Sequence, residues 1–373
     1  MSSPRRDSVA FTVAVTVLAV ACAVPMAVLV GLSGAASTVV LAMLLAAVPV
    51  GPLVAAYLWL DRYEPEPRYL LALGLAWGGF VATAGALLIG GIGQLVAPVS
   101  AEQSLAIVSP LTEEASKGAF LLLLLWWRRS ELDGILDGIV YAGMVGIGFA
   151  FVENVLYLAA AYNGTDGLGP GGTEAVTSTF LFRCVFSPFA HPLFTAFTGI
   201  GVGIAVASRS RVVRVVAPLA GYLFAVVGHS AWNSATLQGI SGFVSVYVVV
   251  MAPALLLVIA FAVWARSSEK SILLAALGDA ARRGLFPGED IVWLVDLRAR
   301  REARSFARAR GGAAGLRAMK DYQAAAIELG FLHHRYLRGT APHDFSERGQ
   351  DFVNQLQAIR PQISFPGQVV ATP

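Results

Sequence analysis

The chain has 373 residues, of which 56% are hydrophobic and only 14% are charged, and its mean hydropathy is +0.67. These values exclude an ordinary soluble globular protein and are typical of a protein that crosses a membrane several times. The two cysteines, Cys22 and Cys184, lie in apolar segments without metal-site spacing, which argues against a structural disulfide and a cysteine-based zinc site.

Eight apolar segments are long enough to span a bilayer, so the sequence predicts an all-α polytopic membrane protein. The first segment follows Arg5 and Arg6 as a signal peptide would, but no small-residue cleavage site closes it, and we predict a retained first helix. The eight segments cover approximately residues 9–31, 36–60, 69–97, 103–127, 134–162, 177–208, 212–237 and 242–265.

Basic residues occur only in every second loop of this arrangement. The loops near residues 32–35, 98–102, 163–176 and 238–241 contain no Lys or Arg. Under the positive-inside rule, this alternation predicts a multi-pass protein of the plasma membrane with both termini in the cytoplasm. The basic residues that carry the argument are Arg5, Arg6, Arg62, Arg68, Arg128, Arg129, Arg209, Arg211, Arg214, Arg266 and Lys270.

The composition changes after the last apolar segment. We predict a transmembrane domain over residues 1–268, with its motifs at about 103–238, and a basic, soluble, cytoplasmic helical tail over 269–373. Residues 266–373 hold 16 Lys and Arg against 11 Asp and Glu, which favours contact with the anionic face of the lipid bilayer. No motif indicates a nucleic-acid partner. His333 and His334 are expected to be a surface pair. The tail helices are predicted at about 271–283, 290–310, 313–338 and 346–359.

Four consecutive apolar segments carry polar residues at membrane depth. A charge there costs at least about 2.5 kcal/mol, so such groups are usually paired, turned toward the protein interior and functional. At about 1.5 Å per residue, Glu113 and His191 lie near the midplane and Glu153 and His229 slightly nearer the outer surface. All four therefore meet in one predicted cavity, biased toward the extracytoplasmic half. The full set is Glu113, Glu114, Lys117, Glu153, Asn154, Arg183, His191, His229 and Asn233.

The spacing of nearby prolines, glycines and polar residues predicts the local geometry around these side chains. Pro188 and Pro192 bracket His191 and predict a kink or break in the sixth segment, because each proline removes a backbone donor. Gly146 and Gly148 predict close approach of a neighbouring helix to the fifth segment. His229 and Asn233 are one turn apart and share a helix face.

Glutamate, histidine and asparagine in one cavity suit hydrolysis. A carboxylate can take a proton from water, and a His/Asn pair can donate hydrogen bonds to an oxyanion. The same Glu and His residues could instead hold Zn²⁺ with an open water position, although no H-E-x-x-H motif is present. An ion- or proton-coupled transporter and a non-catalytic receptor with a partner-binding tail remain alternatives at this point.

Four short motifs, in order on four consecutive segments, resemble the PrsW family of intramembrane proteases, which is related to the CAAX prenyl endopeptidases. The resemblance covers about residues 40–265. The motifs are Glu113-Glu114-x-x-Lys117, Gly148-Phe149-Ala150-x-x-Glu153-Asn154, His191-Pro-Leu-Phe-Thr195-Ala196 with Gly199, and His229-x-x-Trp232-Asn233.

The resemblance implies an intramembrane endopeptidase, described as a metalloprotease, that performs site-1 cleavage of a single-pass anti-sigma factor in a bacterial membrane. It implies that Glu113 activates water and that His229 and Asn233 hold the oxyanion. This chain carries Glu153 where the broader superfamily has histidine, so either His191 takes that role or Glu153 and His191 bind a metal. The expected catalytic set is Glu113, Glu114, Glu153, His191, His229 and Asn233; the expected metal set is Glu153, His191 and His229; and Lys117, Asn154 and Arg183 support them.

Overall fold

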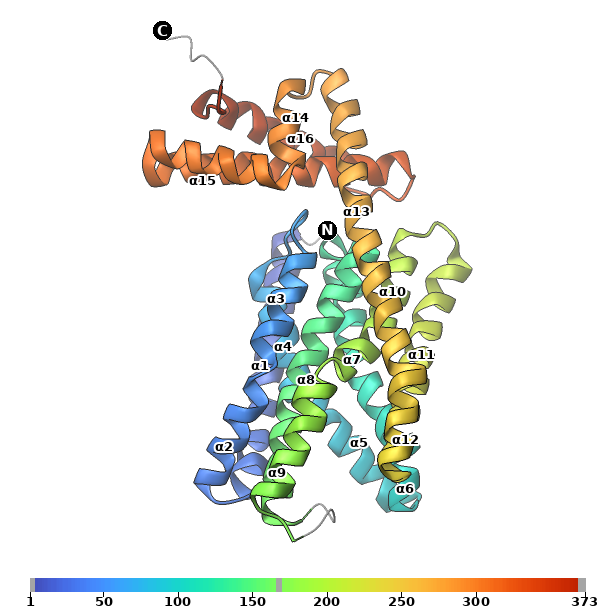
Figure 1. The fold of residues 1–373 in the computed structure, drawn as a ribbon. Coiled ribbons are helices and arrows are strands. Elements are labelled where there is room, and N and C mark those ends of the chain that lie inside the picture. The colour runs from blue at the N-terminus through green and yellow to red at the C-terminus, as the bar shows by residue number, and fades with distance from the viewer. Residues whose placement is uncertain (1–3, 166–169, 368–373) are drawn as a thin grey trace. The chain divides into compact units, whose positions relative to one another are not determined.

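The computed structural model describes residues 4–165 and 170–367, and every regular element within those ranges is a helix (Figure 1). The all-α prediction is therefore confirmed. The chain forms two compact units. The first comprises Met1–Leu60 and Glu66–Ala262, and the second comprises Asp61–Pro65 and Val263–Pro373. The second unit begins close to the predicted tail, and its inclusion of Asp61–Pro65, which lies between two apolar helices, had no signal in the sequence.

Seven helical segments in the described part of the chain are long and apolar enough to cross a membrane, so the chain is a multi-pass membrane protein. The remaining predicted segment, 103–127, is also helical, but Glu113, Glu114 and Lys117 make it too polar to qualify by composition. The seven are Val9–Leu32, Ala36–Leu60, Arg68–Val96, Ile135–Asn163, Thr173–Ala207, Arg211–Leu237 and Gly239–Arg282.

The elements of the first unit follow the predicted order closely. Several long helices contain a π-helical turn, at Trp77–Ala82, Ser104–Val108, Leu181–Phe186 and Tyr247–Met251. The α-helices are α1 Pro4–Leu32, α2 Ala36–Ala47, α3 Val50–Leu60, α4 Arg68–Ala76, α5 Thr83–Val96, α6 Ala101–Gln103, α7 Ser109–Trp127, α8 Ile135–Asn163, α9 Thr173–Phe180, α10 Ala190–Ala207, α11 Arg211–Leu237, α12 Gly239–Val246 and α13 Ala252–Arg282.

Helix α8 is the buried centre of the first unit, and α10 lies beside it (Figure 1). The predicted close approach at its glycines is confirmed. A Cβ added to Gly146 would lie 2.7 Å from the Cα of Pro192, and one added to Gly148 would lie 2.0 Å from the carbonyl oxygen of Leu75. Both contacts are shorter than any carbon atom tolerates, so these glycines allow α10 and α4 to reach α8. This close packing brings the polar residues of α8 and α10 together.

The predicted break around His191 is also present. The helix is interrupted at residues 187–189, and α10 begins at Ala190, which places His191 in its first turn. The carbonyls beside the break have donors. That of Phe182 accepts from Ser187 N at 3.1 Å and Ser187 Oγ at 2.6 Å, and that of Phe186 accepts from Tyr247 Oη at 2.9 Å. Irregular backbone at membrane depth is tolerated because the protein satisfies it.

The second unit packs the end of α13 against α14 Ile291–Val295, α15 Leu297–Leu337 and α16 Phe345–Ile359 around its own apolar core. The backbone of α15 is non-helical at Gly312, where φ is +58°, so α15 consists of two helices, as the predicted segments 290–310 and 313–338 require. The expectation of a surface histidine pair was wrong for His333. That side chain is buried and its Nε2 lies 2.8 Å from Asp279 Oδ2, because this face of α15 packs on α13.

Candidate active site

The ionisable residues predicted at membrane depth converge in the first unit. Helix α7 supplies Glu113, Glu114 and Lys117, while α8, α10 and α11 supply Glu153, His191 and His229. Contacts of 2.7–3.8 Å link these six side chains into one cluster. The structure therefore brings together residues that are as many as 116 positions apart in the sequence.

Lys117 is the cation at the centre of the cluster and has no solvent exposure. Its Nζ lies 2.8 Å from Glu114 Oε1, 3.0 Å from His191 Nδ1 and 3.8 Å from the centre of the Phe149 ring. Because an ammonium group can only donate, His191 Nδ1 must accept, and the ring hydrogen then sits on Nε2. His191 Nε2 donates it to Glu153 Oε2 at 2.7 Å. Both nitrogens of His191 are thus engaged.

His229 has one engaged nitrogen and one free nitrogen. Its Nδ1 lies 2.9 Å from Glu114 Oε1, and because a carboxylate only accepts, Nδ1 carries the hydrogen. Nε2 therefore presents a lone pair, which faces Glu113 Oε2 at 3.8 Å. The Phe194 ring stacks on the imidazole with the centroids 4.8 Å apart, which fixes the plane in which that lone pair points.

The two glutamates of the Glu-Glu motif have different environments. Glu114 is completely buried and accepts hydrogen bonds from Lys117, His229 and Thr195, so its charge is fully compensated. Glu113 keeps 12% of its side chain exposed, and its buried Oε2 accepts no hydrogen bond from any described residue. An unsatisfied buried carboxylate oxygen is costly, and native proteins retain such a group for a ligand, water or proton.

Glu153 belongs to an adjoining network. Its Oε2 forms an ion pair with Arg183 Nη2 and accepts from His191, while Arg183 Nε donates to Asn154 Oδ1 at 2.7 Å. The guanidinium carbon also lies 3.9 Å from the centre of the Tyr157 ring. The predicted supporting residues Asn154 and Arg183 therefore contact the cluster through Glu153.

Asn233 has a hydrogen-bond partner on the segment before α7. Its Nδ2 donates to the carbonyl of Leu105 at 2.9 Å, which commits one amide hydrogen to the segment before α7. The π-helical turn at Ser104–Val108 brings that carbonyl into range. No feature of the sequence indicated this partner.

Three contributors were absent from the predicted site. Thr195 contacts Glu114, and it could have been found because it lies one helical turn after His191. Phe149 and Phe194 hold Lys117 and His229 through their rings. An apolar residue in an apolar helix carries no sequence signal for such a role.

Glu113, His191 and His229 form a group that could bind a metal ion, since ligand atoms from all three lie within 4.8 Å of one another. Two ligands on a tetrahedral metal at about 2.0–2.1 Å lie roughly 3.4 Å apart, which the 3.8 Å between Glu113 Oε2 and His229 Nε2 approaches. His191 can join only by releasing Lys117 or Glu153. The predicted metal set was Glu153, His191 and His229, and the group that the structure brings together contains Glu113 in place of Glu153.

The fold and site define a multi-pass membrane protein with a buried Glu/His cluster of the kind used for hydrolysis. The family model described as "PrsW family intramembrane metalloprotease" matches residues 66–258, which is 193 of the 373 residues, and the chain belongs to this family. The matched region contains every member of the cluster and ends before the second unit.

Two relatives, each named "Protease PrsW", match parts of the chain. The protein from Oceanobacillus iheyensis is 33% identical over 84 residues, which cover 22% of this chain and 33% of the relative. The protein from Geobacillus kaustophilus is 30% identical over 168 residues, which cover 42% of this chain and 64% of the relative. The matches thus span less than two thirds of each relative's length. No solved structure matches the chain.

Proposed function

We propose that this protein is an intramembrane endopeptidase that hydrolyses a peptide bond in a membrane-protein substrate. The observation that carries the proposal is Glu113 Oε2, a buried carboxylate oxygen without a hydrogen-bond donor, which faces the lone pair of His229 Nε2 at 3.8 Å. A purely structural ion cluster would leave neither atom free. Family membership and the name "Protease PrsW" of both relatives agree with this function.

Glu113 is the proposed general base. Its free oxygen accepts a proton from water as the water oxygen forms a bond to the scissile carbonyl carbon. The same proton passes to the amide nitrogen when the C–N bond breaks, which leaves one carboxylic acid product and one amine product. Of the two adjacent glutamates, Glu113 suits this role because its Oε2 accepts no hydrogen bond and 12% of its side chain is exposed, whereas both oxygens of Glu114 already have partners.

His229 is the proposed oxyanion stabiliser. When protonated at Nε2, its imidazolium donates to the carbonyl oxygen on which negative charge develops, and the Glu114 carboxylate at Nδ1 stabilises that charge. Lys117 keeps Glu114 ionised by direct contact. Glu113, His191 and His229 are also the residues that would hold a metal ion such as Zn²⁺. Such an ion would supply Lewis-acid polarisation of the carbonyl and a more acidic water.

The proposal also covers the depth of cleavage, the orientation of the chain in the membrane and the class of substrate. The depths of Glu113, Glu153 and His229 favour cleavage near the extracytoplasmic half of a bacterial plasma membrane, and the alternating basic loops favour cytoplasmic termini. The family resemblance favours an anti-sigma-factor-like protein with one transmembrane helix as substrate.

The proposal is tested with the full chain in proteoliposomes that also contain a tethered transmembrane substrate. We expect Glu113→Gln and His229→Ala each to lower the cleavage rate at least 100-fold, in line with the usual contribution of an acid–base residue. Glu102→Gln is the matched control, because Glu102 is exposed on α6 and contacts nothing in the cluster; it should cleave within twofold of the natural chain.

Two outcomes would contradict the proposal. One is full cleavage by Glu113→Gln with an unchanged thermal unfolding midpoint. The other is substrate-dependent ion flux without any peptide product, which would identify a transporter. A chelator assay and metal analysis test for a bound ion. If a chelator stops cleavage, and if the purified natural chain contains a metal that Glu113→Gln lacks, the ion belongs to this group.

A further inference from the structure

The first half of α15 in the second unit is strongly basic. Its first helix, residues 297–311, ends before the non-helical Gly312 and contains six Arg residues and one acidic residue, Glu302. This half of the helix begins at an N-cap formed by Asp296, whose side chain accepts from the backbone of Arg298 and Ala299. The rest of the unit has a mixed charge. The basic residues are therefore concentrated on one element.

Two faces of this half-helix are distinct. Arg300, Ala303 and Ala307, at helical spacing, are buried. Arg298, Arg301 and Arg308 are exposed and are three and seven residues apart, so they form one row along the other face. The row, here called the arginine stripe, extends about 15 Å along the helix.

The stripe does not serve the internal packing of the unit. Where the unit uses an arginine structurally, it supplies a partner: Arg360 pairs with Asp290, and Arg304 donates to Gln323. Within the described residues, Arg301 and Arg308 have no hydrogen bond or ion pair. Two unpaired cations on one face, with an exposed Arg298 in the same row, leave a positive surface available to an outside partner.

The chain of the second unit is continuous with candidate membrane spans. Asp61–Pro65, which belongs to the second unit, directly follows Leu60 and precedes Arg68, the ends of two candidate membrane spans. Arg300, beside Arg301 in the sequence, donates to the carbonyl of Tyr63 at 3.1 Å. Residues that the basic helix contacts are therefore covalently continuous with membrane spans on both sides, which ties the second unit to the membrane through the chain.

We propose that the arginine stripe binds anionic phospholipid headgroups on the membrane in which the chain itself resides. Arginine forms forked hydrogen bonds to phosphate, and the row matches a surface of many phosphates rather than one deep site. Each basic side chain near an anionic leaflet strengthens attachment about fivefold, and salt screens the attraction. The proposal does not depend on the proteolytic activity proposed above.

A spin label at position 305 tests the proposal, because Ser305 is exposed between Arg301 and Arg308. The full chain carries Ser305→Cys in a Cys22→Ala, Cys184→Ala background and is reconstituted in phosphatidylcholine vesicles with or without 30% phosphatidylglycerol. Accessibility of the label to a water-soluble nickel complex is measured. We expect a decrease of at least twofold in the anionic vesicles, reversed by 0.5 M NaCl.

Two controls make the result specific. The triple variant Arg298→Gln, Arg301→Gln, Arg308→Gln should remove the difference between the two vesicle types. A label at Gln355, exposed on α16, should report the same accessibility in both. Equal accessibility at position 305 in both vesicle types would overturn the proposal. So would stronger protection by an RNA oligonucleotide in neutral vesicles, which would indicate a nucleic-acid surface instead.

Discussion

Each unit of the protein buries a polar cluster, and the two clusters differ in whether their hydrogen bonds are complete. In the second unit, Asp290 is fully buried and accepts from Arg360 Nε at 2.6 Å, Arg360 Nη2 at 3.1 Å and Tyr322 Oη at 2.5 Å. In the first unit, Glu113 Oε2 is buried and accepts none. A complete network stabilises its surroundings, whereas an incomplete one retains a reactive group at a cost in stability.

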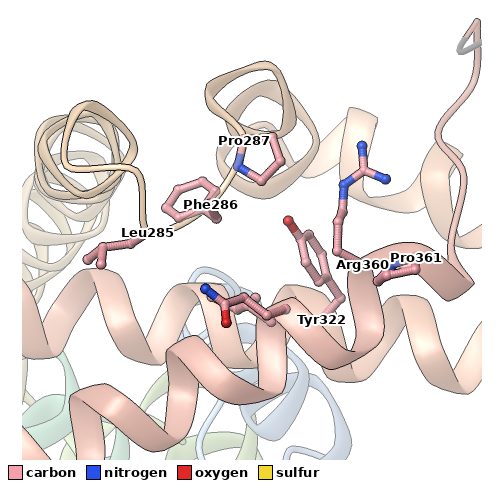
Figure 2. A pocket seen from close by; sticks show the side chains of 8 residues that line it. Leu285, Phe286, Pro287, Tyr322, Arg360 and Pro361 are labelled. Atoms are coloured by element: carbon pink, nitrogen blue, oxygen red, sulfur yellow. The ribbon is translucent and has the colours of Figure 1, made fainter.

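The surroundings of Asp290 fit the structural role. Tyr322 and Arg360 line a mostly apolar pocket of about 240 Å³ together with Leu285, Phe286 and Pro287. Figure 2 shows these side chains. Burial and the neighbouring Asp290 carboxylate raise the pKa of Tyr322 well above its usual range, so its hydroxyl remains a proton donor. The polar atoms of this cluster therefore form hydrogen bonds and ion pairs with one another.

The largest effect that separates the clusters should come from Asp290→Asn. This change leaves the Arg360 guanidinium beside a neutral group, and loss of one partner of a buried ion pair costs about 3–5 kcal/mol. Because Arg360 keeps 23% of its side chain exposed, we expect about 3 kcal/mol, measured by thermal unfolding of the second unit in the full chain. Glu113→Gln, the matched change in the first unit, should leave the unfolding midpoint unchanged. Equal destabilisation by both would remove the distinction.

A mutant cycle on Arg183 and Glu153 sharpens the account of the incomplete cluster. Arg183 is a positioning residue, because it contacts the site through Glu153, which in turn holds His191. Arg183→Gln and Glu153→Gln should each slow cleavage roughly 30-fold by releasing the His191 ring, a loss of about 2 kcal/mol in transition-state stabilisation.

The double variant tests whether Arg183 affects the cleavage rate only through Glu153. If Arg183 acts only through Glu153, the double variant should cleave no more slowly than Glu153→Gln alone. Multiplied losses, close to 900-fold, would show that Arg183 contributes separately. Arg183→Lys, which retains a positive charge beside Glu153 but cannot bond Asn154 in the same way, should recover part of the rate.

The smallest effect should come from Tyr322→Phe. It removes one of three donors to Asp290 and leaves the Arg360 ion pair intact, so we expect a loss of about 1.5 kcal/mol in the unfolding free energy, typical of a hydrogen bond to a charged group. Cleavage should not change. A loss as large as that of Asp290→Asn would mean that the tyrosine rather than the arginine compensates the carboxylate.

The sequence by itself determined the helical membrane architecture and the set of reactive residues. Hydropathy and the spacing of Pro188, Pro192, Gly146 and Gly148 are local properties, and they predicted the spans, the break before α10 and the tight packing of α8. Depth along a helix is also local, which is why Glu113, His191 and His229 could be placed in one cavity before their contacts were known.

Tertiary structure alone decided which atoms in that set are free. Side-chain contacts among four helices leave Glu113 Oε2 and His229 Nε2 unbonded, engage both nitrogens of His191, and direct Asn233 to Leu105. The same holds for the pairing of Asp290 with Arg360, 70 residues away, and for the assignment of Asp61–Pro65 to the second unit. Hydrogen bonds between distant segments depend on rotamers and helix packing, and neither leaves a periodic signal in the sequence.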